Sequence, residues 1–158
     1  MKAESVVTIR KELSHRSHDD IMQLCLRLAR FKKENKELLT YLLFEADNEE
    51  RYISSIKAEI DEHFENINRA SYFYIKKSVR KILRNIKKYA RYSLKKETEV
   101  ELLLYFCEKL IDFKPTIKRN VTLTNILNRQ LTFIKKITNT LHEDLQYDYN
   151  QKLIALKF

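Results

Sequence analysis

Positively charged side chains dominate one part of the sequence, residues 66–96, which contain 11 lysine and arginine residues and no aspartate or glutamate. At about 100° per residue, the apolar residues of this segment fall along one line of a predicted helix, and the basic residues occupy the opposite sector. The candidate binding residues are Lys77, Arg80, Lys81, Arg84, Lys87, Lys88, Arg91 and Lys95. Such a face can bind a polyanion, because cationic side chains release the counterions of successive phosphates.

Three explanations of this basic segment are open. In the first, its helix folds back on residues 45–65, which hold eight of the 22 acidic residues, and flanking charges pair within the protein. In the second, the exposed face binds nucleic acid, and Tyr72, Tyr74 and Tyr92 offer stacking surfaces for unpaired bases. In the third, the amphipathic helix lies on an anionic membrane or in a partner's groove.

Residues that catalyse reactions form no recognisable pattern. The chain has no glycine, which excludes the phosphate-binding loop, the dinucleotide-binding turn and the nucleophile elbow. The pair His15 and His18 lacks a second cluster at metal-binding spacing. Glu59 and His63 share a predicted helix face, but the repeated motif of di-iron bundles is missing. The sequence therefore predicts no enzymatic activity, no cofactor and no metal.

The two cysteines, Cys25 and Cys107, both lie among apolar residues at helical spacing. We expect two reduced, buried thiols, because two such cysteines do not make a disulfide framework. The longest apolar runs fall far short of the ~20 residues that a membrane span requires, and the first residues resemble neither a signal nor a transit peptide. These features favour a cytoplasmic protein, with a formal net charge of +9.

Apolar residues recur with helical periodicity along the whole chain. The pattern predicts one all-α domain, residues 1–158, with six or seven helices in an irregular antiparallel bundle or a short, α-solenoid-like stack of helix pairs. Ser17 is the expected N-cap of one helix, and Pro115 is the one strong stop signal. Two points stay open. Residues 49–93 form either one helix or two, and the C-terminal region has a possible break between two helices near residues 139–142.

Residues 17–93 and 97–158 show a weak resemblance to each other, which suggests an internal duplication. The leading functional hypothesis is a non-enzymatic cytoplasmic binding or scaffold protein that presents its basic helix face to an acidic protein surface. The alternative is a protein that binds the backbone of RNA or DNA through residues 76–95. An enzyme with an unmarked site ranks third, and the sequence does not specify the oligomeric state.

Overall fold

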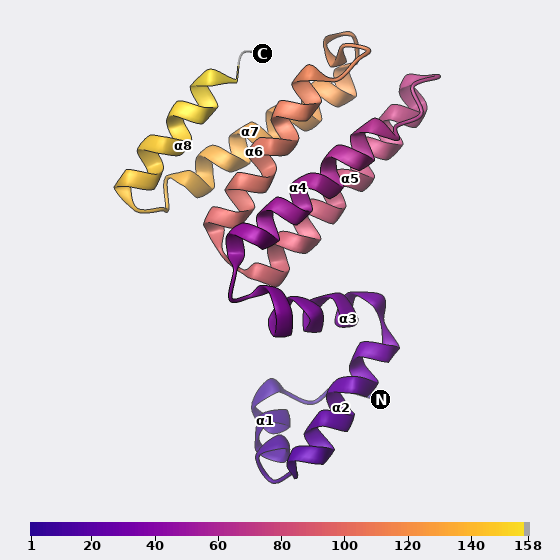
Figure 1. Cartoon of the computed structure of the whole chain (residues 1–158), viewed down its shortest axis with the longest axis vertical. Coiled ribbons are helices and arrows are strands. Elements are labelled where there is room, and N and C mark those ends of the chain that lie inside the picture. Colours follow the sequence, from indigo (N-terminus) through magenta and orange to yellow (C-terminus); the bar gives the residue numbers. More distant parts are fainter. Residues whose placement is uncertain (157–158) are drawn as a thin grey trace. The chain divides into compact units, whose positions relative to one another are not determined.

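The chain is helical throughout the part that the structure, a computed structural model, describes, which is residues 1–156 (Figure 1). This part contains eight α-helices, one π-helical turn, one 3₁₀ turn and no β-strand. The predicted all-α class is confirmed, whereas the predicted number of six or seven helices is wrong. Both open joins are true breaks: one helix ends at Glu65 and the next begins at Tyr72, and a second break separates Thr138 from Glu143.

Backbone contacts divide the chain into two compact units, Met1–Phe44 and Glu45–Phe158, where the sequence predicted one domain. The boundary falls inside residues 17–93, the first copy of the suggested duplication, and the duplication stays a prediction. The elements of the first unit are α1 (Val6–Ser14), α2 (His18–Phe31) and α3 (Lys33–Thr40), followed by the π-helical turn Tyr41–Glu45.

Helix α2 begins as the sequence predicts. The Ser17 hydroxyl oxygen accepts a hydrogen bond from the Asp20 backbone N–H at 3.1 Å, and the Asp20 carboxylate accepts one from the Ser17 N–H at 3.3 Å. This reciprocal pair satisfies two donors that the first turn would otherwise leave free. However, α1, α2 and α3 contain no buried residue. The expectation of a buried Cys25 is therefore wrong, because three short helices provide too few neighbours to cover it.

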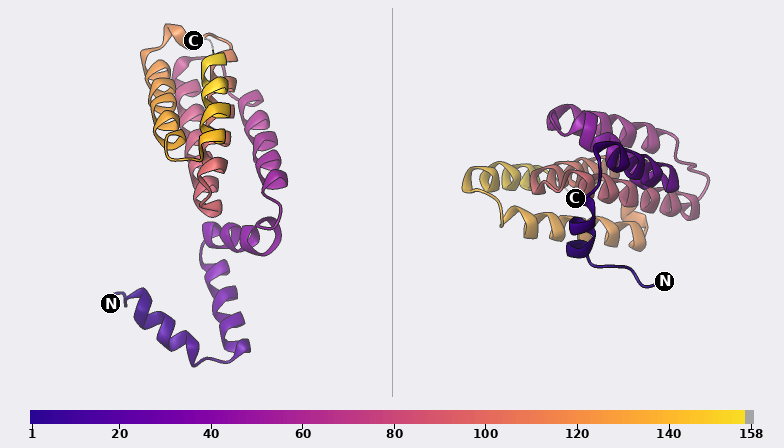
Figure 2. Two further views of the ribbon diagram at one scale, coloured as in Figure 1. Left: turned by 90° about the vertical axis from the view of Figure 1, so that its left-hand side faces the viewer. Right: turned by 90° about the horizontal axis from the view of Figure 1, so that it is seen from below.

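The second unit is an antiparallel helical bundle, in which successive helices run in opposite directions (Figure 1). Helix α6 packs against α4, α5 and α7, and α7 packs against α8. Views from two further directions place α5 and α7 on one side of α6 and α4 on the other (Figure 2). The elements are α4 (Glu49–Glu65), α5 (Tyr72–Ser93), α6 (Lys96–Asp112), a 3₁₀ turn (Ile117–Arg119), α7 (Val121–Thr138) and α8 (Glu143–Ala155).

Helix α6 supplies the centre of the core. Its buried side chains include Leu102, Leu103, Phe106, Cys107 and Leu110, each fully removed from solvent. Burial raises the pKa of the Cys107 thiol to about 12, with a smaller contribution from the charge of Glu108, so the thiol is protonated at neutral pH. Cys107 is thus buried, as the sequence predicts. Because α6 is covered on several sides, it holds the neighbouring helices in fixed positions.

Candidate polyanion-binding surface

The two sides of α5 differ as its sequence pattern predicts. Ile75, Val79, Ile82 and Ile86 are each at most 3% exposed and face the bundle core. Burying four such side chains fixes the rotation of the helix about its axis. Turning the helix would expose this apolar surface to water, at a free-energy cost of several kcal/mol. The opposite side therefore points away from the core. This burial also leaves the apolar side of α5 unable to enter a membrane, which was one of the three explanations of the segment.

Six of the eight candidate residues are exposed on the outer side of α5. They are Lys77, Arg80, Lys81, Arg84, Lys87 and Arg91. Lys88 is half-buried, and its Nζ lies 4.7 Å from the centre of the Tyr89 ring. Lys95 lies outside the helix, since α5 ends at Ser93 and the backbone turns at Leu94. Its Nζ is 3.0 Å from the Glu49 carboxylate, so the charge of Lys95 is partly neutralised.

Helix α4 packs against α5, as the first explanation required, and its Glu49 pairs with Lys95, but its Asp61 and Glu59 bind other partners. Asp61 accepts hydrogen bonds from Lys109 and Tyr105 of α6, at 2.7 Å from each. Glu59 accepts one from the Tyr89 hydroxyl at 2.9 Å. Among the described residues, no ion pair involves Lys77, Arg80, Lys81, Arg84 or Arg91, which leaves the outer side of α5 without internal neutralisation.

A second acid-free segment lies beside α5. Residues 113–142 contain six lysine and arginine residues and no aspartate or glutamate. The Tyr72 hydroxyl donates a hydrogen bond to the Thr116 carbonyl at 2.8 Å, which joins the start of α5 to the connection before α7. Further along, the Lys87 Nζ lies 5.5 Å from the centre of the Phe133 ring on α7. The two positively charged segments therefore meet at two points.

This contact extends the candidate site to residues that sequence reasoning missed. On α7, Arg129 and Lys136 lie four residues before and three residues after Phe133, on the same side of the helix, and both are exposed. We define the basic surface as the exposed basic residues of α5 together with those of residues 114–136. The added members are Lys114, Lys118, Arg119, Arg129, Lys135 and Lys136, all exposed. The lack of acids over residues 113–142 was the signal that could have found them.

Exposed aromatic rings lie at one end of this surface. Phe73 is 67% and Tyr74 46% exposed, and their rings make an edge-to-face contact with centroids 5.5 Å apart. Phe73 precedes Lys77 by one turn and so belongs to the same side of α5. Of the three tyrosines proposed to stack on bases, only Tyr74 is exposed. Tyr72 is half-buried through its bond to Thr116, and Tyr92 is half-buried against Tyr89.

The acidic residues of the second unit gather on the other helices and their flanks. Glu101 of α6 binds Lys57 of α4 at 2.6 Å and Lys152 of α8 at 2.9 Å. Neither α5 nor α7 contains an acidic residue. Because α5 and α7 contribute basic and no acidic side chains, we expect a positive potential above them that attracts anions from solution.

The other features of the described residues provide no second candidate site for chemistry. Within residues 1–156, no group of three or more His, Cys, Asp or Glu side chains is arranged to hold a metal ion. None of the described helices combines the length and apolar character needed to cross a membrane. No protein-family model matches the chain, and no curated protein or solved structure shows significant similarity to it. The basic surface is therefore the feature from which a function can be inferred.

Proposed function

We propose that the second unit binds nucleic acid through the basic surface, with contacts to the phosphate backbone and no dependence on base sequence. One observation carries this proposal: the outer side of α5 has no acidic residue, its six exposed basic side chains form no ion pair with the described residues, and the basic surface continues onto α7. From Lys77 to Arg91 the helix rises by about 21 Å, which is enough for several successive phosphates. The exposed rings of Phe73 and Tyr74 favour single strands, whose unstacked bases can lie on aromatic side chains.

An acidic protein partner is the competing hypothesis. The core of a protein interface is usually depleted in lysine and charged residues and contains apolar anchors. The outer side of α5 has no apolar centre between Lys77 and Arg91, and three of its six exposed basic residues are lysines. This composition resembles a phosphate-binding surface more closely than an interface core, so it supports nucleic acid over protein.

The test uses a triple variant, Arg80→Glu with Arg84→Glu and Arg91→Glu, which reverses three exposed charges that have no partner among residues 1–156. We expect a single-stranded oligonucleotide to bind on the order of 100-fold more weakly, and the slope of log K against log salt to fall by about 2, since each phosphate contact on a single strand contributes about 0.7. The thermal midpoint should stay within about 2 °C, because these side chains make no buried contact.

The matched control carries the same change of charge elsewhere: Lys2→Glu with Lys11→Glu and Lys36→Glu, all exposed in the first unit. It should bind the oligonucleotide nearly as well as the natural chain. If the natural chain does not bind single strands or duplexes at ~50 mM salt, the nucleic-acid proposal is wrong and an acidic protein partner becomes the better hypothesis. Equal losses in the two triple variants would also overturn it, because the effect would then reflect net charge alone.

A further inference from the structure

The exposed aromatic side chains of the second unit are concentrated on the basic surface. Among residues 45–156, four phenylalanine and tyrosine side chains are exposed: Phe73, Tyr74, Phe133 and Tyr147. The first two lie in the first turn of α5, and Phe133 lies on α7 beside Lys87, whereas Tyr147 belongs to α8. Exposed rings that touch each other form a patch, and an apolar patch bordered by polar residues is typical of a contact site.

Phe73 stands at the head of the row of cations on α5. At about 100° per residue, four exposed basic residues of the helix lie within about 40° of the direction of Phe73. They are Lys77, Arg80, Arg84 and Arg91. A strand whose phosphates follow this row therefore brings the bases at one of its ends to the Phe73 ring.

The geometry of the two rings leaves room for a flat ligand. The planes of Phe73 and Tyr74 are 80° apart, and their centroids are separated by 5.5 Å. An edge-to-face contact of this kind uses the edge of one ring and one face of the other, so the remaining faces stay open to solvent. The contact also restricts both side chains before a ligand binds, which reduces the entropy that binding costs.

The charges around the rings indicate that the ligand is anionic. The hydrogen bond from Tyr72 to Thr116 brings the connection before α7 beside the start of α5. Three exposed basic residues lie within three positions of Thr116: Lys114, Lys118 and Arg119. A ligand that fits here combines negative charge with flat faces. A single strand offers both, whereas a duplex keeps its bases stacked on one another and must unpair to present a face.

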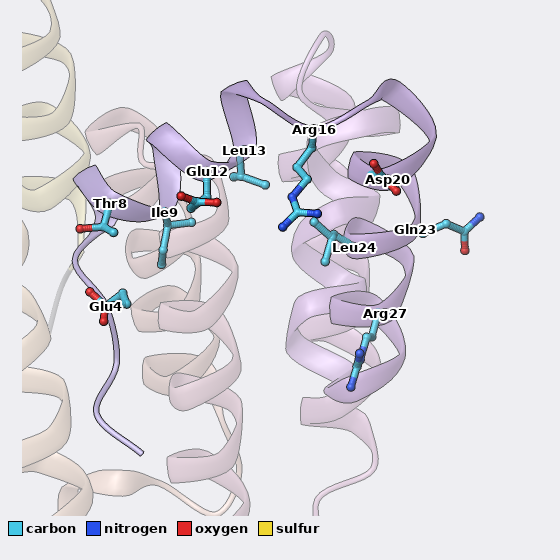
Figure 3. Close-up of a pocket in the computed structure, with 10 residues that line it drawn as sticks. All are labelled: Glu4, Thr8, Ile9, Glu12, Leu13, Arg16, Asp20, Gln23, Leu24 and Arg27. Atoms are coloured by element: carbon cyan, nitrogen blue, oxygen red, sulfur yellow. The ribbon is translucent and has the colours of Figure 1, made fainter.

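The groove of the first unit lacks this combination. It lies between α1 and α2 and has a volume of about 470 Å³ (Figure 3). The described residues that line it include no aromatic side chain, and their charges are of both signs: Glu4, Glu12, Arg16, Asp20 and Arg27. Because three of these five are carboxylates, the groove does not favour a chain of phosphates.

We propose that Phe73 and Tyr74 form a base-stacking platform, which raises the affinity of the basic surface for unpaired bases but not for duplexes. This inference rests on the proposed function, since it assigns overall affinity to the cations and selectivity for single strands to the two rings. Stacking requires a flat base but no particular hydrogen-bonding edge, so the platform recognises unpaired bases whatever their sequence.

The double variant Phe73→Ala with Tyr74→Ala tests the platform. We expect a single strand of about 12 nucleotides to bind about 10–100-fold more weakly, and a duplex of the same sequence to bind with nearly unchanged affinity. The slope of log K against log salt should stay the same, because every cation remains. Tyr147→Ala removes a ring that is as exposed as Phe73, at 67%, but lies outside the basic surface, and it should leave both affinities unchanged.

A strand of equal length built from abasic nucleotides provides a second test, because it keeps the phosphates and lacks the bases. We expect the natural chain to bind it about 10–100-fold more weakly than the intact strand, and the double variant to bind both strands almost equally. Thermal unfolding of the double variant should match that of the natural chain within about 2 °C, since both side chains are exposed.

The outcomes separate the platform from the proposed function. If the double variant binds the intact strand as tightly as the natural chain, or loses the same factor for the duplex, the platform is overturned. In that case a loss of binding in the triple arginine variant would still support the proposed function. If the natural chain binds neither the single strand nor the duplex, both proposals are wrong.

Discussion

Leu94, the residue after α5, adopts a left-handed backbone conformation with φ of 60°. This conformation closes many helices and is usually occupied by glycine, since a Cβ atom there costs about 1–2 kcal/mol. The chain contains no glycine, so a leucine that is 85% exposed occupies the position instead. The Ser93 and Thr98 hydroxyls donate hydrogen bonds to the Glu49 carboxylate, at 2.5 and 2.6 Å. These bonds hold the turn in place, so the strain at Leu94 is tolerated.

We therefore expect Leu94→Gly to raise the free energy of unfolding by about 0.5–1 kcal/mol. Removal of the Cβ atom relieves the strain, and the greater freedom of glycine in the unfolded chain offsets part of this gain. Denaturant unfolding of the natural chain and the variant measures the difference. Leu94→Ala is the control, because it removes the exposed side chain but keeps the Cβ atom, and it should change stability little. Equal stability of the glycine and alanine variants would contradict this account.

The two cysteines show what local sequence can and cannot establish at the scale of residues. Cys25 and Cys107 have similar apolar neighbours in the sequence, yet one is exposed and the other fully buried. Burial depends on which helices pack against the segment, and that information is not local. The N-cap at Ser17 was predictable because its two hydrogen bonds join residues only three apart.

At the scale of elements, the apolar line of α5 was predictable, and so was the outward direction of its basic residues. Periodicity identified the face that each helix buries, but it did not identify the helices that remain uncovered. The apolar residues of α2 have the pattern of a core helix, although no residue of α2 is buried. Likewise, α7 was predicted as a helix, but its position beside α5 depends on contacts such as Lys87 with Phe133.

Glu101 links three helices of the bundle, because its carboxylate accepts hydrogen bonds from Lys57 of α4 and Lys152 of α8. Burial opposes ionisation of this group, but the two lysines outweigh that effect and hold its pKa below the ordinary value of 4.5. A carboxyl whose pKa is lowered by folding stabilises the protein above about pH 4.5. That stabilisation is lost as the pH falls through the lowered pKa of the folded state.

Accordingly, Glu101→Gln should lower the free energy of unfolding by about 1 kcal/mol at pH 7, a value reduced for the partial exposure of the pair. The difference from the natural chain should shrink below pH 4.5 and disappear once the natural carboxyl is protonated. Denaturant unfolding between pH 7 and pH 3 measures both effects. Glu108→Gln, an exposed change on the same helix, should have no effect at any pH. If Glu101→Gln lowered the free energy of unfolding by the same amount at every pH, this electrostatic explanation would be excluded.

At the scale of the whole molecule, two separate acid-free segments come together in the second unit. Their composition is visible in the sequence, since residues 66–96 and 113–142 contain no aspartate or glutamate. Their contact through Tyr72 and Thr116 is visible only in the folded chain, because 44 residues separate the two. The sequence therefore predicted half of the basic surface, and the fold supplied the other half.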